Sequence, residues 1–498
     1  MVTSRSGDRV VPMFISDTSP FISDILVRCG LAFNDILDAE KLRQSLETLL
    51  KREGWNKLGG RLKSNGNGGV DYHIPADYTA ESPPIEYLHA EYDMKMGDHP
   101  VASRLPRLAP QANLQPLMLD GYDDLVDLFS HDIKDRKLNF WLDKDRPLLS
   151  LYVTSFRDGT LVSLIWPHAV LDLMGLNSVV DAWLLVLQGR DAEIATPYGG
   201  SDPFVPFMQS AKELHVLADT LIQSFGFIFL VLRLMFNTFW GSAQRRIICV
   251  PAPFVKRLRD SALKDLDSDA NTYKPPFLSD SDLVTAWLTR TEVSVSPPNV
   301  KNMVAVMNAH SERDALTEAG LLPKGTPYLS NAIGSLITLV NEQDILNNSI
   351  GHLASWIRRS IIEQSTVGQV QAFMTTWLTS KTKYYPFFGH WRMHMSVLTN
   401  WSKANWYEKN FSAAAKQQPL ESDQQVSPVL PGRPFYVQCN NLPPYVTDSM
   451  SVIVGKDMLG NFWINIRLPK TKCARMERLL AKTRLETASP DLVKNKNE

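Results

Sequence analysis

The apolar and polar positions at the start of the chain change their spacing where one predicted element gives way to the next. An apolar run at residues 25–33 predicts a strand. Asp38 then precedes leucines at helical spacing, which predicts an N-capped amphipathic helix ending near Gly54. The apolar face of this helix consists of Leu42, Leu46, Leu49 and Leu50. Together the two segments predict a strand followed by a core-forming helix.

A second unit has the same order of elements but begins with a hairpin. Two largely apolar runs at residues 149–156 and 160–166 flank Asp158-Gly159, a dipeptide typical of tight hairpin turns. The later apolar positions recur at helical spacing until Gly189 and predict an amphipathic helix: Leu173, Leu176, Val180, Trp183, Leu184 and Leu187. Between strand and helix stands Trp166-Pro-His-Ala-Val-Leu-Asp-Leu-Met-Gly175. At such a strand end, a rigid scaffold can present a side chain to a cleft.

The second half of the chain again alternates between strand-like and helix-like segments. We predict strands at residues 247–250 and 300–308, helices at 253–263 and 281–290, a long helical region at 333–365, a hairpin of 451–454 and 462–468 around Gly460-Asn461, and a helix at 474–482. Residues 415–434 are polar and contain prolines, which predicts a loop. The pattern predicts an α/β fold, with a crossover between two domains after the Pro/Gly-rich residues 196–206.

One segment does not fit an amphipathic pattern. Residues 225–241 are apolar all round except for Arg233 and Asn237, and Arg245-Arg246 follow them. The segment is too short and too interrupted to predict a transmembrane helix. Three interpretations stay open: a buried helix joining two domains, a lid over an apolar substrate channel, or a helix at residues 225–240 lying in a membrane interface beside the basic pair.

Length and composition narrow the function classes. The 498 residues suit two domains of roughly 200 residues each. Lysine plus arginine number 52 and aspartate plus glutamate 53, so the net charge of −1 gives no electrostatic reason for a nucleic-acid partner. The cysteines are Cys29, Cys249, Cys439 and Cys473. They lack the spacing of metal ligands or of redox pairs, which suits buried thiols in a reducing compartment. The first residues lack the apolar core of a secretory signal, so cytoplasmic residence is expected. We also expect the chain to be a monomer.

A histidine four residues before an aspartate is a candidate for proton-transfer chemistry, but the spacing alone is not informative here. It occurs six times, beginning at His73, His89, His131, His168, His215 and His310. Only His168 follows a predicted strand and precedes a predicted helix, and the other copies fall in broken or charged stretches. His168 is therefore the candidate general base, because neutral imidazole accepts protons near working pH. The alternative is a satisfied core histidine.

Several further motifs, in a fixed order, accompany this one. They are Leu42-Arg-Gln-Ser-Leu-Glu-Thr-Leu-Leu50, Leu58-Gly-Gly-Arg-Leu62, Phe277-Leu-Ser-Asp-Ser-Asp-Leu-Val-Thr-Ala-Trp287, Tyr328-Leu-Ser-Asn-Ala-Ile333 and the segment 399–414 that begins Thr-Asn-Trp. Together with the histidine motif, the set resembles the BAHD-type (HXXXD) acyl-CoA-dependent acyltransferases, in particular their fungal branch of trichothecene 3-O-acetyltransferase type. The resemblance covers most of the chain.

The resemblance implies two chloramphenicol-acetyltransferase-like α/β domains, each a mixed sheet with flanking helices, and an active site in a channel at their interface. We expect the first domain at residues 1–210, a crossover at 211–246 and the second domain at 247–498. A return of residues 390–420 to the first domain is left open. Acyl-CoA is the implied co-substrate, and no metal is required.

The resemblance also assigns roles to single residues. Asp172 is expected to turn away from the imidazole and lock the loop through an arginine, with Arg313 as the candidate partner. Thr399 and Trp401 match family positions near the oxyanion. Ser279 and Asn331 fall in segments that line the coenzyme side in relatives. The donor's phosphates would meet basic side chains, of which Lys256, Arg257 and Arg259 are available, although a solvated helix face explains these three equally well.

The chain departs from the family pattern in two segments, Asn410 to Ala414 and Asn308-Ala-His-Ser-Glu-Arg313, and in the second of these the family usually has arginines. Asn410-Phe-Ser-Ala-Ala414 stands where the family has Asp-Phe-Gly-Trp-Gly, which removes a charge, two glycines and an aromatic ring. Condensation domains of peptide synthetases carry a doubled histidine where this chain has Pro167, which favours a free acyl-thioester donor. No Gly-x-Ser-x-Gly elbow is present, so direct attack in a ternary complex is preferred over a covalent acyl-enzyme.

The expected reaction is O-acylation, most simply acetylation, of a bulky apolar alcohol such as a terpenoid of fungal secondary metabolism. A non-catalytic ligand-binding relative with the same fold is one alternative, motivated by the altered Asn410 to Ala414 segment. An N-acyltransferase or condensation-like enzyme is another. Peripheral membrane contact through residues 225–240 is a further open expectation.

Overall fold

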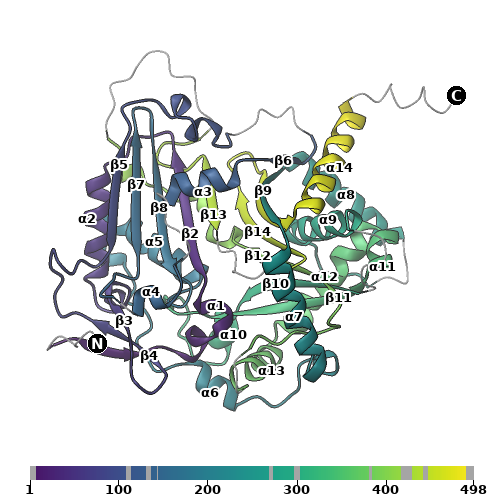
Figure 1. Cartoon of the computed structure of the whole chain (residues 1–498), viewed down its shortest axis with the longest axis horizontal. Helices are drawn as coiled ribbons and strands as arrows, with labels where there is room; N and C mark the ends of the chain where they lie inside the picture. The colour runs from purple at the N-terminus through teal and green to yellow at the C-terminus, as the bar shows by residue number, and fades with distance from the viewer. Residues whose placement is uncertain are drawn as a thin grey trace.

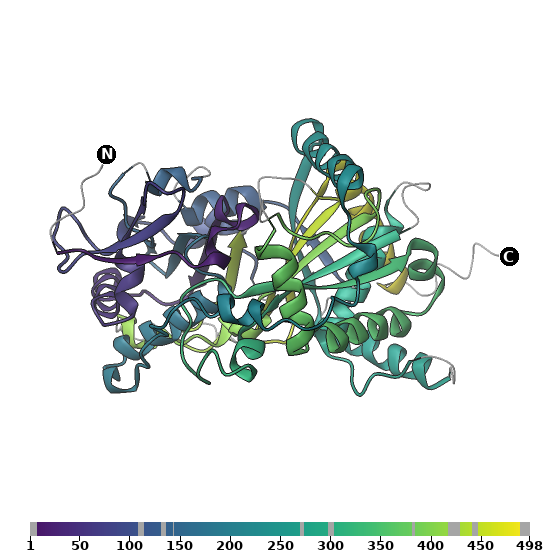
Figure 2. The ribbon, with the colours of Figure 1, turned by 90° about the horizontal axis from the view of Figure 1, so that it is seen from below.

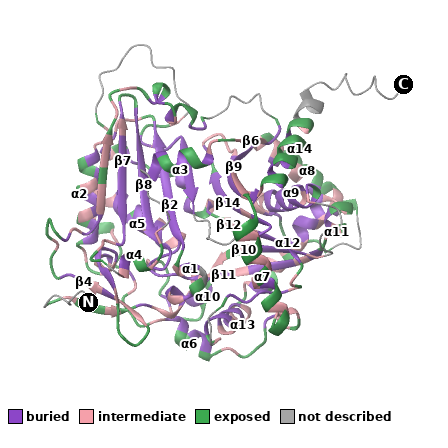
Figure 3. Cartoon of the chain, viewed as in Figure 1, coloured by how far each residue is buried: buried purple, intermediate pink, exposed green. Residues whose placement is uncertain are grey.

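The computed structural model describes residues 7–107, 114–130, 136–142, 144–268, 273–296, 303–380, 384–416, 429–440 and 447–488. Two α/β domains lie side by side, each with a mixed sheet and flanking helices (Figure 1). The buried positions follow the strands of both sheets and the inner faces of the helices, whereas exposed positions lie on outer helix faces and loops (Figure 3). The expected two-domain α/β architecture is therefore observed.

The sheet of the first domain has the strand order β13-β2-β8-β7-β5. Its strands are β2 (Leu26–Phe33), β5 (Glu86–Glu91), β7 (Ser150–Phe156), β8 (Gly159–Pro167) and β13 (Tyr436–Asn440), and a small separate sheet contains β1 (Arg9–Pro12), β3 (Arg61–Ser64) and β4 (Val70–Ile74). Helices α2 (Ala39–Leu50) and α5 (Leu173–Leu187) contact each other. The Asp38 side chain accepts a hydrogen bond from the Lys41 backbone N–H, and the predicted leucine face of α2 is fully buried. The predicted capped helix is confirmed.

The hairpin β7–β8 is also confirmed, with its turn one residue earlier than predicted. Phe156 pairs with Gly159, so Arg157 and Asp158 form the loop. The Asp158 carboxylate accepts a hydrogen bond from the Met96 backbone N–H at 2.7 Å. A Cβ at Gly159 would lie 2.4 Å from the Phe33 carbonyl oxygen, so close backbone approach requires glycine there. These tertiary contacts decide where the turn lies.

The sheet of the second domain has the order β11-β10-β12-β14-β15-β9-β6. Its strands are β6 (Leu117–Leu119), β9 (Ala243–Val250), β10 (Met303–Ser311), β11 (Ile333–Asn341), β12 (His394–Asn400), β14 (Ser449–Lys456) and β15 (Phe462–Pro469). Helices α8 (Ala252–Ser268), α9 (Asp280–Ser294) and α12 (Ile350–Gln364) contact one another, and their apolar side chains share a core with this sheet. The other α-helices are α1 (Pro20–Ser23), α3 (Tyr122–Ser130), α4 (Asn139–Leu142), α6 (Phe204–Gln209), α7 (Ser224–Trp240), α10 (Arg313–Glu318), α11 (Glu342–Asn347), α13 (Val367–Leu378) and α14 (Lys470–Ala488).

The long helix predicted at residues 333–365 is wrong in its first part. Residues Ile333–Asn341 form β11, antiparallel to β10, and helix α12 starts only at Ile350. The β-branched residues of segment 333–341 favour a strand. The side chain of Gln364, at the end of α12, accepts from the Ile337 N–H at 2.8 Å and donates to its carbonyl at 2.7 Å. The neighbouring strand and this amide together satisfy backbone groups that a helix would have satisfied internally.

The two domains exchange segments in both directions. Strand β6, from the first part of the chain, pairs with β9 in the second sheet. In return, β13 pairs with β2, and the apolar side chains of residues 401–414 join the core of the first domain. The chain crosses at β6, outside the expected crossover at 211–246, and the returning side chains at 401–414 lie within the range 390–420 that was left open for a return.

Helix α7 projects from the body of the second domain, most clearly in Figure 2, where it stands at the upper rim. Within this helix, which the structure describes in full, Leu230 alone is buried. The exposed large apolar residues are Phe225, Ile228, Phe229, Leu232, Met235, Phe236, Phe239 and Trp240. Phe225 is 77% and Trp240 74% exposed, so the interpretation of this segment as a buried joining helix is wrong. No described helix is both long enough and apolar enough to cross a membrane.

Candidate active site

His168 lies in the turn between β8 and α5. Its backbone N–H donates to the Ile25 carbonyl at 2.8 Å, and the Trp166 indole N–H donates to the Leu171 carbonyl at 2.9 Å across the turn. Asp172 caps α5 by accepting from the Gly175 backbone N–H at 2.9 Å. The strand end, the indole and the cap thus fix the backbone that carries the imidazole.

The His168 side chain lines a cavity of about 130 Å³ between the two domains. The first domain contributes Ile22, Ile25, Val27 and Leu173, and the second contributes Met307, Ala309, Ile333, Gly334, Ser335, Trp377, Tyr385, Phe387, Met395, Val397, Leu398, Thr399, Trp401, Thr447 and Met450. His168 is 9% exposed, so the imidazole faces a space shared by both domains and is not enclosed within one of them. The predicted oxyanion residues Thr399 and Trp401 lie in the same cavity.

Asn331 determines which imidazole nitrogen of His168 carries the proton. The Asn331 side-chain N–H₂ donates to the His168 carbonyl at 2.8 Å, and its oxygen lies 3.0 Å from His168 Nδ1. Since an amide oxygen only accepts, Nδ1 must carry the proton. The unprotonated nitrogen is then Nε2, the atom that can accept a proton from a substrate.

The surroundings of the imidazole keep it neutral. Burial lowers the pKa of His168 below its usual value of 6.5, although Asp172 and the Asn331 oxygen favour the charged form. A general base must be unprotonated to act, so the lowered pKa makes His168 available at neutral pH.

Asp172 does not orient the imidazole but forms the predicted pair with Arg313. Both contacts of the bidentate pair measure 2.8 Å. Burial by itself would raise the pKa of Asp172, but the Arg313 charge and hydrogen bonds, with the N–H groups of Ala332 and Gly175, lower it below its usual value. Arg313 also donates to the carbonyls of Tyr328 and Ser330, so the pair ties the motif to the segment that carries Asn331.

The two residues predicted for the coenzyme side lie in different places. Ser279 caps α9 and lines a groove of about 560 Å³ together with Ser402 and Lys456. Asn331, in contrast, is fully buried against His168, so it holds the imidazole instead of lining a coenzyme surface. Ser402 in the groove wall directly follows Trp401 of the His168 cavity in the chain, and the two spaces share no lining residue.

The three basic residues predicted for the donor's phosphates all lie on α8 and have protein partners. Lys256 pairs with Asp260 at 2.8 Å, Arg257 donates to the Leu114 carbonyl, and Arg259 binds the Leu278 carbonyl and Asp280. None of them lines the His168 cavity or the Ser279 groove.

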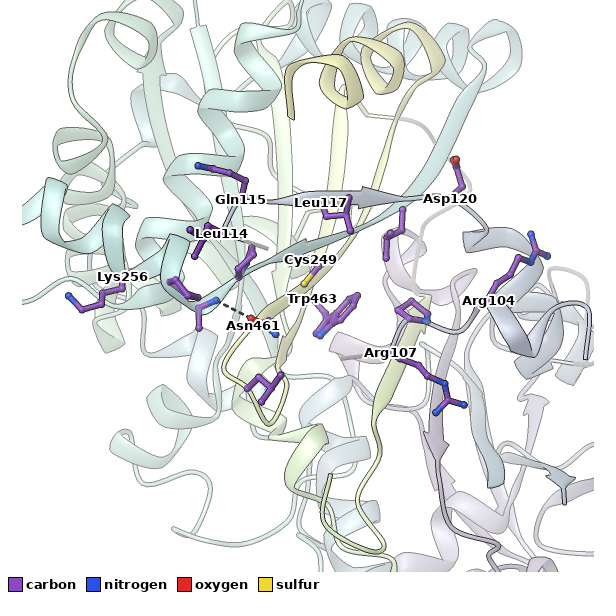
Figure 4. Close-up of a pocket in the computed structure, with 16 residues that line it drawn as sticks. Arg104, Arg107, Leu114, Gln115, Leu117, Asp120, Cys249, Lys256, Asn461 and Trp463 are labelled. Carbon is purple, nitrogen blue, oxygen red and sulfur yellow. Dashed lines mark hydrogen bonds between the residues drawn. The ribbon is translucent and has the colours of Figure 1, made fainter. Parts of the chain in front are cut away.

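A larger cavity, of about 900 Å³, lies beside strands β6 and β9 (Figure 4). It shares no lining residue with the His168 cavity. Burial raises the pKa of the Cys249 thiol in its wall to about 12, which leaves the sulfur protonated and a poor nucleophile. Its Arg104 and Asp120 are held in ion pairs with Asp124 and Arg246. This cavity offers no general base of the kind that His168 provides.

One buried residue of this site, Asp17, was not predicted from the sequence. It lies before the first strand of the main sheet and has no motif around it. The Asp17 carboxylate accepts two hydrogen bonds from Asn331, both at 2.7 Å.

Among the described residues, no group of histidine, cysteine, aspartate and glutamate could hold a metal ion.

No family model matches the chain. Acetyltransferase sphE of Aspergillus fumigatus is 31% identical over 503 residues, 97% of each chain. O-acyltransferase pboC of Aspergillus ustus is 30% identical and covers 92% of this chain and 96% of its own. A protein of Penicillium decumbens named transcriptional regulator calD is 31% identical over 96% of each chain.

Two kinds of solved structure share the fold. TRI101 of F. graminearum, complexed with coenzyme A and T-2 mycotoxin, has a TM-score of 0.66 at 16% identity, covering 94% of this chain and 96% of that one. Vinorine synthase has a TM-score of 0.59 at 13% identity, covering 97% and 95%. The predicted two-domain fold and the predicted resemblance to fungal acyltransferases are confirmed by these similarities.

Proposed function

Because this chain belongs to the family of fungal acetyltransferases and O-acyltransferases, we propose that it transfers an acyl group, most simply acetyl, from acyl-CoA to a hydroxyl group of a bulky apolar metabolite. The observation that carries the proposal is the neutral imidazole of His168, with Nδ1 held by Asn331, in a cavity shared by both domains. The complexes of TRI101 with coenzyme A and with deoxynivalenol or T-2 mycotoxin support both substrate classes by analogy.

In the proposed reaction His168 Nε2 takes the hydroxyl proton while the oxygen attacks the thioester carbonyl. The tetrahedral intermediate collapses when the carbon–sulfur bond breaks, and the imidazolium returns the proton to the departing thiolate. The Thr399 hydroxyl and the Trp401 indole N–H, both in the cavity wall, are the proposed donors to the oxyanion. None of the four cysteines lines the described cavity, which supports direct attack without an acyl-enzyme.

The cavity wall supports an apolar acceptor. Its residues are mainly aliphatic, aromatic and methionine side chains. Its volume of about 130 Å³ is smaller than the roughly 300–1,000 Å³ of typical ligand sites. Binding of a bulky alcohol therefore requires side chains to move, and the unbranched Met307, Met395 and Met450 adapt their shape easily. We assign the Ser279 groove to the coenzyme because Ser402 in its wall directly follows Trp401 of the cavity in the chain.

The test is acyl transfer by the purified chain, with acetyl-CoA and a panel of hydroxylated terpenoids and matched amines, read as free thiol released and product mass. We expect acetylated alcohols, and a loss of about 10²- to 10⁴-fold in kcat for His168→Ala. His352→Ala, which removes a histidine on α12 outside the cavity, is the matched control and should keep wild-type kcat. Equal turnover by His168→Ala and wild type would refute the assigned base, and products from amines alone would refute O-acylation.

A second candidate function is ligand binding without turnover, which the name of the relative calD and the altered Asn410 to Ala414 segment favour. Phe411 and Ala414 are nevertheless buried in the core of the first domain, so this segment still packs. Isothermal titration with coenzyme A separates the two functions. Binding of coenzyme A without slow thioester hydrolysis or transfer to any acceptor would favour the non-catalytic protein.

We further propose that α7 lies in a membrane interface. Its exposed apolar residues follow one another at helical spacing, so they form one stripe along a projecting helix (Figure 2). Phe229 contacts Trp391, and the Arg392 guanidinium lies 4.6 Å from the Trp391 ring centre, which places a cation beside aromatic rings. A protein–protein interface is the alternative for such a patch.

Cosedimentation of the full chain with phosphatidylcholine–phosphatidylserine vesicles tests this contact. The variant Phe225→Asp/Phe236→Asp should remain in the supernatant while the wild type sediments. Leu263→Asp, at a leucine of α8 that is 47% exposed, is the matched control and should sediment like the wild type. A wild type that stays in the supernatant refutes membrane contact. A dimer that only the α7 variant loses would assign the stripe to a second copy.

A further inference from the structure

Asp17 is a buried acidic residue that the proposed chemistry does not use directly. It lies in a short 3₁₀ helix, Ile15–Thr18, and is fully buried. One carboxylate oxygen, Oδ1, accepts from both the backbone N–H and the side-chain N–H₂ of Asn331, each at 2.7 Å. Since Asn331 contacts His168, the carboxylate is two hydrogen bonds away from the proposed base.

We propose that Asp17 is a positioning residue that locks the amide of Asn331 and thereby fixes the tautomer of His168. This inference rests on the proposed function only in its choice of Nε2 as the base. The lock follows from the hydrogen-bonding capacity of the three groups and needs no bound substrate.

The amide of Asn331 has two distinct ends and two competing orientations. In the observed one, its N–H₂ group donates to the Asp17 carboxylate and to the His168 carbonyl, both of which can only accept. A flipped amide would place its oxygen against these two acceptors and leave buried polar groups without hydrogen-bond partners. The oxygen therefore stays directed at His168 Nδ1, which keeps its proton, and Nε2 stays free.

Without the carboxylate, the lock loses one of its two acceptors. The amide could then turn its N–H₂ group toward Nδ1, which would make Nδ1 the acceptor and move the imidazole proton to Nε2. An imidazole protonated at Nε2 cannot take a proton from the acceptor alcohol with that nitrogen. Replacement of Asp17 should thus impair the chemical step and leave binding of acyl-CoA unaffected.

The surroundings of Asp17 give this lock a pH dependence. Burial raises the pKa of Asp17 to about 7, while the Lys57 charge and the Asn331 hydrogen bonds lower it in part. The other titratable groups around the carboxyl are Tyr72, Tyr328 and His168, with Asp202 near Lys57. A carboxylate accepts hydrogen bonds more strongly than a carboxylic acid, so the lock is tighter above pH 7 than below it.

Three variants of the full chain test the proposal. In Asp17→Leu we expect kcat to fall by roughly tenfold or more with an unchanged KM for acetyl-CoA, since base catalysis contributes about 10²- to 10⁴-fold. Asp17→Asn keeps an acceptor oxygen and should retain most of the kcat, but lose the step in the kcat profile near pH 7. Asn331→Asp places two carboxyl groups together and should be impaired.

The ¹⁵N spectrum of histidine-labelled protein reads the tautomer directly, with the His168 signals identified by their absence in His168→Ala. We expect protonated Nδ1 in the wild type and in Asp17→Asn, and a shift toward protonated Nε2 in Asp17→Leu. An unchanged tautomer together with unchanged kcat in an Asp17→Leu variant that folds, by circular dichroism, would overturn the inference. The spectrum needs no substrate, so a wild type without transferase activity would refute the proposed function and leave the lock testable.

Discussion

The ion pair between Asp172 and Arg313 should contribute more to stability than any exposed pair of the described chain. The Asp172 side chain is 2% and the Arg313 side chain 16% exposed, and the two side chains share two hydrogen bonds of 2.8 Å. In Arg313→Ala, the buried carboxylate keeps only the N–H groups of Gly175 and Ala332 as donors. Breaking a buried pair in this way typically costs about 3–5 kcal/mol, against about 0–1 kcal/mol for a surface pair.

Removal of the aspartate instead of the arginine changes the stability for different reasons. In Asp172→Ala, the guanidinium retains the carbonyls of Tyr328 and Ser330 as acceptors, but α5 loses its cap, which by itself is worth about 1 kcal/mol. We therefore expect a loss of about 3 kcal/mol. The double variant should lose less than the sum of the single losses, because it no longer contains an unpaired buried charge.

Urea unfolding followed by far-ultraviolet circular dichroism measures these losses, and Arg190→Ala, which breaks an exposed pair with Glu193, is the matched control. The folded-state pKa of Asp172 is lowered, so the pair stabilises the fold above the ordinary carboxyl pKa of 3.8. This contribution disappears as the pH falls through the folded-state pKa. An Arg313→Ala midpoint equal to that of the control, or strictly additive losses in the double variant, would show that the pair does not hold the two segments together.

Three further outcomes are expected. Because burial lowers the pKa of His168 below 6.5, the acid limb of kcat in Asp17→Asn, which lacks the Asp17 step, should lie below that pH; a limb above 6.5 in this variant would contradict the neutral imidazole. Ser279→Ala removes the capping box of α9 and should lower stability by about 1 kcal/mol and raise the KM for acetyl-CoA; an unchanged KM would exclude the groove as coenzyme site. Gly432→Ala should lower the free energy of unfolding by more than about 1 kcal/mol, since φ is +73° and a Cβ would lie 2.2 Å from the Ser412 nitrogen; a neutral effect would show that the returning segment can move.

The sequence by itself determined the elements whose periodicity reflects burial on one side. Helices α2 and α5 are such elements, because a helix with one buried face repeats its apolar residues at a fixed spacing. The strand–turn–helix context also separated His168 from the five other histidines with the same spacing. The Arg313 partner of Asp172 came from the family resemblance, and the geometry agrees with it.

The tertiary structure alone decided the features that depend on distant segments. Strand β11 has apolar residues on both faces and therefore lacks a distinctive period, so only its pairing with β10 identifies it. The solvent exposure of α7 could not be derived from its composition, because an apolar helix looks the same whether or not another surface covers it. Asp17 contacts Asn331 across 314 positions of the chain. The local spacing of apolar residues indicates which face of a segment is buried, but not which distant segment packs against it. The position of the His168 imidazole depends on such a distant contact, with Asn331.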